Sequence, residues 1–155
     1  LELVLGLNLA GALKAVISGV SLTVIGTLLA GLGVIFHPIT LLQLSLLILT
    51  TSIAFNGMMF LLMVRVEDPL VPRAMFGVLN TLLFFPSGAI SPISGFPKWL
   101  RAIAVVDPFT YAVHGFKAIL LKDGGFAAIW SDLLFLLGFG VVALLIATPL
   151  FKRTL

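Results

Sequence analysis

The sequence lacks cysteine and has few charged residues. Without cysteine there are no disulfide bonds and no thiolate metal sites. Only 10% of the 155 residues are charged and 61% are hydrophobic, whereas soluble domains have about 25% charged and about 45–50% apolar residues. A soluble fold of this size cannot bury so much apolar surface. The composition therefore predicts a chain that folds in a lipid bilayer.

Charge is absent from two long stretches, residues 15–64 and 74–97. Such gaps are typical of membrane spans, because a charge at the bilayer centre costs roughly 2.5–3.5 kcal/mol on insertion scales. The net charge of +3 is small and scattered along the chain, which argues against a nucleic-acid surface. There is no internal repeat or polar linker, so we expect one domain or part of one.

Four segments are long and apolar enough to cross a bilayer, which requires about 20 mainly apolar residues. These segments are residues 12–36, 41–64, 74–92 and 127–150. His37 and Pro38 are expected to end the first span, because the residue before a proline avoids the helical region. Pro86 is expected to kink the third span or to end its regular part.

The stretch between the third and fourth spans predicts two short helices. Residues 98–106 form an amphipathic segment in which Trp99 favours the membrane interface. Asp107 and Pro108 are typical of a helix start, with Asp as N-cap and Pro at the first helical position. The second helix, of about 14 residues, is too short to span the bilayer and too apolar for a solvated loop. We therefore predict a re-entrant helical hairpin over residues 97–121.

Lysine and arginine residues predict the orientation of the spans. The first side carries Lys14, Arg65, Arg73, Lys152 and Arg153, and the opposite side carries Lys98, Arg101, Lys117 and Lys122. The basic residues of the first side adjoin helix ends, and the loop on the other side is long. We therefore place the 65–73 loop and the C-terminus in the cytoplasm.

Three segments resemble the signature of the ABC-2 type permeases, which are the membrane subunits of ATP-driven exporters. Residues 85–92 read FPSGAISP, residues 96–100 read FPKWL and residues 107–113 read DPFTYAV. The family pattern is roughly FLSGAxFP, LPxWL and NPLTYAVDALR. The opening stretch at residues 5–15, LGLNLAGALKA, also resembles the region that leads into the third span of the family.

The resemblance implies that residues 1–155 are part of an ABC-2 transmembrane domain. The fold would be an all-α membrane protein with spans three to six of a six-span subunit and a re-entrant hairpin before the last span, on the extracytoplasmic side. The chain begins with Leu1 and has no features of a signal peptide. We therefore expect the first two spans and a cytoplasmic coupling helix to lie upstream.

The resemblance also implies the partners and the location. The chain would form a homo- or heterodimer with a second permease subunit and bind two copies of an ABC ATPase. ATP and Mg would be bound by that partner subunit, and no cofactor is expected in this chain. The protein would be multi-pass in the inner (plasma) membrane and would export an amphipathic substrate such as a drug, a lipid or a glycan.

The sequence departs from the family pattern at three positions. Asp107 stands where the family usually has Asn, and either residue caps a helix. Pro86 replaces an apolar residue and is expected to stiffen or bend the outer end of the third span. His114 stands where an acidic residue is common, so no charge-based role is carried over to it.

Three groups of candidate site residues follow from these patterns. Residues expected to shape the hairpin are Trp99, Asp107, Pro108 and Tyr111. Polar residues that either pack helices together or line a substrate path are Gln43, Asn56 and Ser87. Residues that form either a solvated cytoplasmic turn or a contact with the ATPase are Arg65, Glu67, Asp68 and Arg73.

Two other classes of function are alternatives to the permease. The chain has no GxxxxGK[ST] phosphate loop, so we expect a transport subunit without its own ATPase site. The alternative is a secondary transporter or channel driven by an ion gradient. It requires ionisable residues within the spans, and the four spans are interpreted as lacking them.

An intramembrane hydrolase is the third possibility. It would use Ser87 with His114, but this chemistry needs a nucleophile held against a base and an oxyanion hole, and Phe85 occupies the position where a glycine is expected. Asp107 and His114 also have no third residue nearby that would complete a metal site. We interpret Asp107 as a helix cap and His114 as an interfacial side chain.

Overall fold

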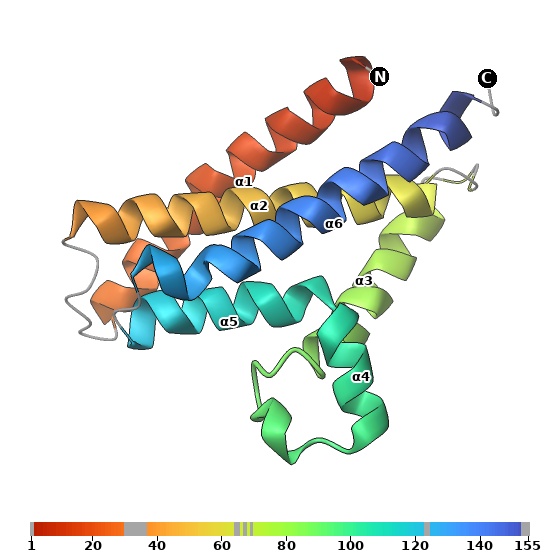
Figure 1. Cartoon of the computed structure of the whole chain (residues 1–155). Helices are drawn as coiled ribbons and strands as arrows, with labels where there is room; N and C mark the ends of the chain where they lie inside the picture. Colours follow the sequence, from red (N-terminus) through yellow and green to blue (C-terminus); the bar gives the residue numbers. More distant parts are fainter. Residues whose placement is uncertain are drawn as a thin grey trace.

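The computed structural model describes residues 2–29, 37–63, 66, 68, 70–122 and 125–152 (Figure 1). Over these ranges the chain is helical and contains no strand. The α-helices are α1 (Glu2–Leu29), α2 (Pro38–Met63), α3 (Leu70–Phe84), α4 (Lys98–Val106), α5 (Pro108–Leu121) and α6 (Phe126–Lys152), with a short 3₁₀ turn, η2 (Ile93–Gly95), before α4. The predicted all-α membrane fold is confirmed.

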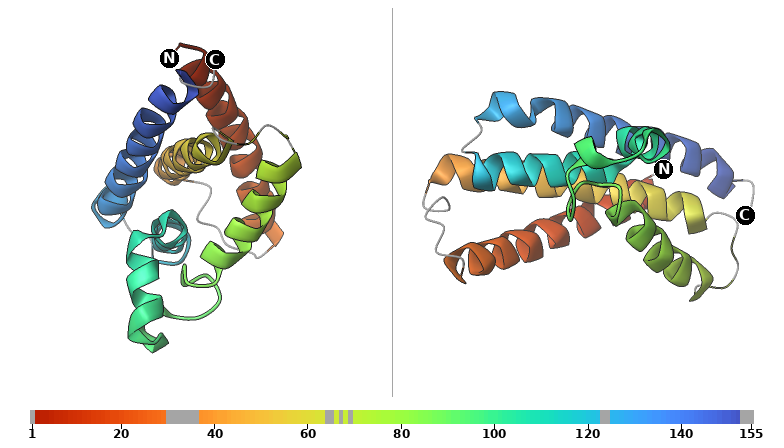
Figure 2. Two further views of the ribbon diagram at one scale, coloured as in Figure 1. Left: turned by 90° about the vertical axis from the view of Figure 1, so that its right-hand side faces the viewer. Right: turned by 90° about the horizontal axis from the view of Figure 1, so that it is seen from below.

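Three helices are long and apolar enough to cross a membrane. The qualifying stretches are Leu9–Leu29 in α1, Pro38–Leu62 in α2 and Phe126–Leu150 in α6. Figure 2 shows α2 at the centre, with α1, α3, α5 and α6 around it. The outer faces of α1 and α6 carry large exposed apolar side chains such as Leu22 and Leu145, as expected for helices that contact lipid.

Two of these three helices lie close to the expected spans at both ends. α2 and α6 match residues 41–64 and 127–150 to within three residues at each end. α1 begins at Glu2, well before the expected start at residue 12, and the end of that span, residues 30–36, lies outside the described residues. As a result, Lys14 lies within α1 and not at its start.

The third expected span is a short helix followed by irregular chain. α3 ends at Phe84, two residues before Pro86, because a proline ring clashes with the preceding helical turn. Its 15 residues measure about 22 Å, less than the roughly 30 Å hydrocarbon core. Residues 85–92 form turns, and Gly88 adopts φ 79°, a conformation that costs glycine little and other residues more.

α4 and α5 form the bent helix pair that corresponds to the predicted hairpin, and α5 is the part that packs into the bundle. Their axes differ by 81° at Asp107. From there α5 runs along α2 and α6 and ends beside the start of α6 (Figure 1). The turn of the hairpin lies near the middle of α6, because Asp107 and Phe139 line the same cavity. Such a bend occurs both in a re-entrant loop and in a broken span, so the re-entrant hairpin over residues 97–121 stays a prediction.

Two glycines allow α2 and α6 to pack closely. A Cβ atom on Gly57 would lie 3.1 Å from the carbonyl oxygen of Gly140, and a Cβ atom on Gly140 would lie 3.1 Å from the backbone nitrogen of Ala54. Small residues at such crossings let backbones approach, which is the main source of helix association in lipid. This contact fixes the positions of α2 and α6, the two spans that hold the hairpin.

Gly140→Ala is expected to destabilise the subunit, because the new Cβ atom would lie 2.8 Å from Cγ2 of Ile53 and 3.1 Å from backbone atoms of α2. Overpacking of this kind costs typically about 1–3 kcal/mol. Gly138→Ala is the matched control, since a Cβ atom there meets nothing within 4 Å. Thermal unfolding of the detergent-solubilised protein measures the difference. Equal melting temperatures for the two variants would contradict the close α2–α6 contact.

Candidate functional site

Asp107 ends one helix and begins the next. Its backbone is extended, with φ −76° and ψ 119°, as expected for a residue that precedes a proline. Its backbone N–H donates to the carbonyl of Ile103 at 3.1 Å, and its Oδ1 accepts from the N–H of Phe109 at 2.9 Å. Pro108 occupies the first helical position and is buried. α5 therefore begins at the position that Asp107 and Pro108 predict.

Aromatic contacts hold the hairpin against its neighbours. The Tyr111 hydroxyl donates to the carbonyl of Val105 at 2.8 Å, and the Tyr111 ring stacks on Phe135 of α6 with centroids 3.7 Å apart. Phe109 packs against Phe55 of α2, with centroids 4.3 Å apart. Tyr111 thus links α5 both to α6 and to the end of α4.

Trp99 lies on the outside of the hairpin. It is exposed, as are Ile103 and Val106 on the same face of α4. The guanidinium of Arg101 donates to the carbonyls of Ser94, at 2.9 Å, and Phe96, at 3.4 Å, which fixes α4 to the turn before it. Trp99 therefore faces the surroundings of the chain, whereas Asp107, Pro108 and Tyr111 face the bundle.

His114 forms a polar contact with the last span. Its Nδ1 atom lies 2.8 Å from Oδ2 of Asp132 in α6, and the carboxylate accepts this hydrogen bond. Asp132 is buried (3% exposed), whereas the histidine side chain is 59% exposed. The sequence analysis interpreted His114 as an interfacial side chain and did not predict this partner in α6.

Asp132 was not among the residues that the sequence singled out. It also corrects the statement that the spans lack ionisable residues, as does Lys14 within α1. The sequence does contain a signal for Asp132, because an acidic residue inside a long apolar helix is by default a candidate functional residue. Its partner was not predictable from spacing, since His114 lies 18 positions away. No group of three or more possible metal ligands occurs in the described part of the chain.

Ser87 is part of the turn that follows α3. Its Oγ donates to the carbonyl of Phe84 at 2.6 Å and accepts from the N–H of Ala89 at 3.4 Å. Ser87 and His114 line the same cavity of about 180 Å³, but their polar atoms bond to other groups. The structure thus uses Ser87 to shape the backbone, and it does not hold the serine against a base as a hydrolase requires.

Lys117 connects α5 to the same turn. Its ammonium group donates to the carbonyl of Gly88 at 2.6 Å. This hydrogen bond gives a partner to the cationic side chain and to a carbonyl of irregular backbone. Lipid offers no hydrogen-bond partner to such a carbonyl. Lys117 and His114 therefore fix α5 on two sides, to the turn after α3 and to α6.

The two polar residues of α2 lie in different surroundings. Asn56 donates to the Ser52 hydroxyl at 3.4 Å and packs against α1 at Gly11, where a Cβ atom would lie 2.8 Å from its Nδ2. Gln43 is buried near the other end of α2. The position of Asn56 favours helix packing over a substrate path.

The predicted ATPase-facing loop is described only in part. Arg65 and Glu67 lie outside the described residues, and so does the side chain of Arg73, whose backbone belongs to α3. Asp68 is exposed and accepts a hydrogen bond from the N–H of Leu70 at 2.8 Å. Asp68 therefore caps the start of α3.

The apolar helices and the inserted hairpin define an integral, multi-pass membrane protein. The family model described as ABC-2 type transporter matches residues 1–121, a range that includes α1 to α5. The chain belongs to the ABC-2 type transporter family, and it is a membrane component of ABC-type transport, not itself an ATPase. A search of the curated proteins and a search of the solved structures each found no match.

The His114–Asp132 pair can be tested by a double-mutant cycle with His114→Leu, Asp132→Leu and the double variant. His114→Leu is expected to lower stability, because it leaves a buried carboxylate without its partner. The double variant is expected to recover part of this loss. The coupling should be about 1 kcal/mol, at the low end for charged hydrogen bonds because the histidine is exposed.

Thermal unfolding in detergent measures the cycle. His37→Leu serves as the control, since His37 is exposed at the start of α2. Strictly additive effects of the two substitutions would show that the pair contributes nothing to holding α5 on α6.

Proposed function

We propose that this chain is the permease part of an ATP-driven exporter of amphipathic substrates in the plasma membrane. The observation that carries the proposal is the family match over residues 1–121 together with the re-entrant hairpin packed into the bundle. Outward transport, the substrate class and a dimer of permeases with two ATPase subunits are parts of the proposal. The membrane role in ABC-type transport follows from the family itself.

The packing suggests which parts move during transport. α2 and α6 contact each other closely through their glycines, and α5 is fixed to both. α3 has fewer contacts with the rest of the described chain, and α4 leaves most of its surface exposed. We propose that α2, α5 and α6 move as one unit when the ATPases close. α3 would move separately from this unit, because it comes directly after the cytoplasmic loop on which the ATPases would act.

A second candidate, transport driven by an ion gradient, is favoured by one observation. His114 and Asp132 are an ionisable pair within the bundle, and such pairs mark proton and ion pathways in transporters. The two candidates differ in energy source, so they are separated by what drives transport.

The test uses everted vesicles that contain the intact subunit and its ATPase. We expect a fluorescent amphipathic substrate to accumulate only when ATP and Mg²⁺ are added, because the energy comes from the partner. A protonophore should leave accumulation unchanged. Accumulation driven by a pH gradient without ATP would reject the proposal in favour of the second candidate.

Cysteine labelling tests the orientation, and the absence of native cysteines removes background. Single cysteines at Asp68 and Lys152 are expected to react only with reagents that reach the cytoplasm, and those at His37 and Gly125 only with external reagents. The reason is that the start of α3 and the end of α6 lie at the opposite end of the bundle from the starts of α2 and α6 (Figure 1). Labelling of Asp68→Cys and Gly125→Cys from the same side would contradict this topology.

A further inference from the structure

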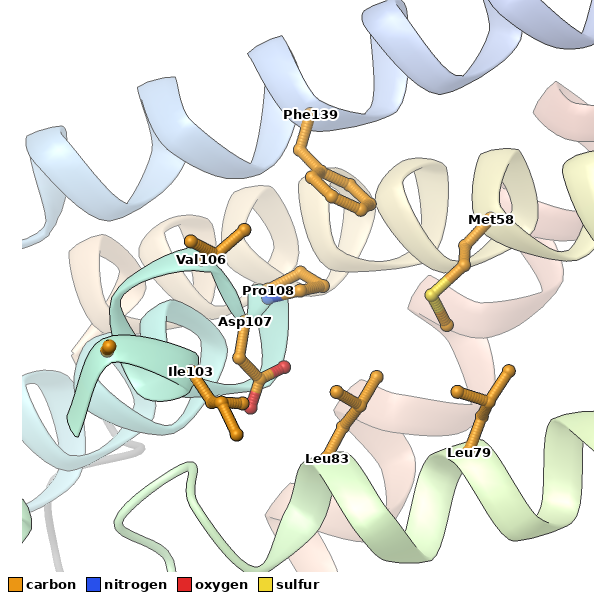
Figure 3. A pocket seen from close by; sticks show the side chains of 9 residues that line it. Met58, Leu79, Leu83, Ile103, Val106, Asp107, Pro108 and Phe139 are labelled. Atoms are coloured by element: carbon orange, nitrogen blue, oxygen red, sulfur yellow. The ribbon is translucent and has the colours of Figure 1, made fainter. Parts of the chain in front are cut away.

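Two cavities lie beside the hairpin, and they differ in the ligands that they can select. The larger, of about 530 Å³ at the turn between α4 and α5, has an almost wholly apolar lining that includes Leu79, Leu83 and Phe139 (Figure 3). The smaller, of about 180 Å³, lies between α5 and the turn that follows α3, and its lining includes His114 and Lys117. Of the two, the smaller cavity is the one with a positively charged side chain in its lining.

Lys117 brings a positive charge to the wall of the smaller cavity. Its ammonium group donates to the carbonyl of Gly88, a residue that also lines this cavity. An ammonium group has three N–H donors, so two of them remain for a ligand. Lys117 is exposed, and no carboxylate in the described part of the chain forms an ion pair with it. Gly88 therefore fixes the position of the ammonium group without neutralising its charge.

His114 lies on the same side of α5, one turn before Lys117. Its Nδ1 atom is bonded to the buried carboxylate of Asp132, so Nε2 is left for a ligand. The histidine side chain is 59% exposed, and a ligand can therefore reach it. When the ring is protonated, Nε2 is a second N–H donor beside the ammonium group. The hydroxyl of Ser87, in contrast, is already bonded to backbone. An anion is the ligand that complements these groups.

The position of the cavity corresponds to the level of lipid headgroups. Lys117 lies four residues before the end of α5 at Leu121, which is about 6 Å along the helix, and this end lies beside the start of α6 (Figure 1). Trp130, near the start of α6, is exposed, as is typical of tryptophan at a membrane interface. Lipid phosphates carry negative charge at this level, and basic pockets between membrane helices bind such headgroups.

We propose that this cavity binds the phosphate group of a membrane phospholipid. The phosphate oxygens accept from the ammonium group of Lys117 and from Nε2 of His114. The volume of about 180 Å³ is smaller than the roughly 300–1,000 Å³ of sites that enclose a small molecule, so it fits a headgroup phosphate and not a whole lipid. Lysine binds phosphate as a point charge. The inference is independent of the proposed function, because it concerns binding and not transport.

The test is a thermophoresis titration of the purified, intact subunit in a non-ionic detergent at neutral pH. The probes are dioctanoyl phosphatidic acid, which carries a phosphate, and dioctanoylglycerol, which has the same acyl chains and no phosphate. We expect the phosphatidic acid to bind at least about tenfold more tightly, because hydrogen bonds between ionised groups are the strong ones. Equal affinities would overturn the proposal.

Inorganic phosphate distinguishes a lipid ligand from a free anion. We expect it to compete only weakly with dioctanoyl phosphatidic acid, because it lacks the acyl chains that keep a lipid at the surface of the protein. If inorganic phosphate binds as tightly as the phosphatidic acid, the ligand is a free anion, and the assignment to a membrane phospholipid is overturned.

Lys117→Gln isolates the charge, because an amide can still donate to the carbonyl of Gly88. It is expected to remove the preference for phosphatidic acid, whereas Lys117→Arg, which restores a cation, should retain most of it. Lys122→Gln is the matched control, since Lys122 is an exposed lysine at the end of the same helix; it should keep the full preference. A preference that survives in Lys117→Gln, or that is lost equally in Lys122→Gln, would overturn the proposal.

Val113→Phe tests the cavity with Lys117 and His114 unchanged. Val113 lines the cavity, and the larger ring takes up part of the space. The affinity for phosphatidic acid should therefore fall toward that for dioctanoylglycerol. Unchanged affinity would show that the phosphate binds elsewhere. Size-exclusion profiles and melting temperatures check that each variant is folded.

Discussion

The structure depends on one constraint: lipid offers no hydrogen bonds to a backbone that leaves a helix at depth. The hairpin satisfies this constraint within residues 103–111. Asp107 supplies an N–H donor to the end of α4 and a carboxylate acceptor to the start of α5, and the Tyr111 hydroxyl donates to the carbonyl of Val105. Without this arrangement the chain could not turn inside the bundle, and the α5 surface that packs on α2 and α6 would not exist.

The same constraint governs the polar side chains of the spans. Hydroxyls in α1, α2 and α6 donate to carbonyls four residues earlier, as Thr23, Thr51 and Thr148 do. Larger polar groups are satisfied across elements, by His114 with Asp132 and by Lys117 with Gly88.

The features of the fold and the site that could be predicted from the sequence are those that depend on neighbouring residues. Asp107 and Pro108 predicted the start of α5, and Pro86 predicted that α3 ends early, because both effects act through neighbouring backbone. The α2–α6 contact at Gly57 and Gly140 and the pairing of His114 with Asp132 join residues far apart in sequence. Periodicity carries no information about such partners. The angle between α4 and α5 was likewise inaccessible, since it depends on what each helix packs against.

Asp107 connects the end of α4 to the first turn of α5, and this has a physical consequence. Because Oδ1 of Asp107 accepts from the N–H of Phe109, any displacement of Asp107 acts directly on the first turn of α5. One turn further along α5, Tyr111 stacks on Phe135, and near its middle His114 bonds to Asp132, so displacement of α5 is transmitted to α6 by two contacts of different kinds. A displacement of the turn between α4 and α5 therefore reaches α6, and α5 is the element that links the two.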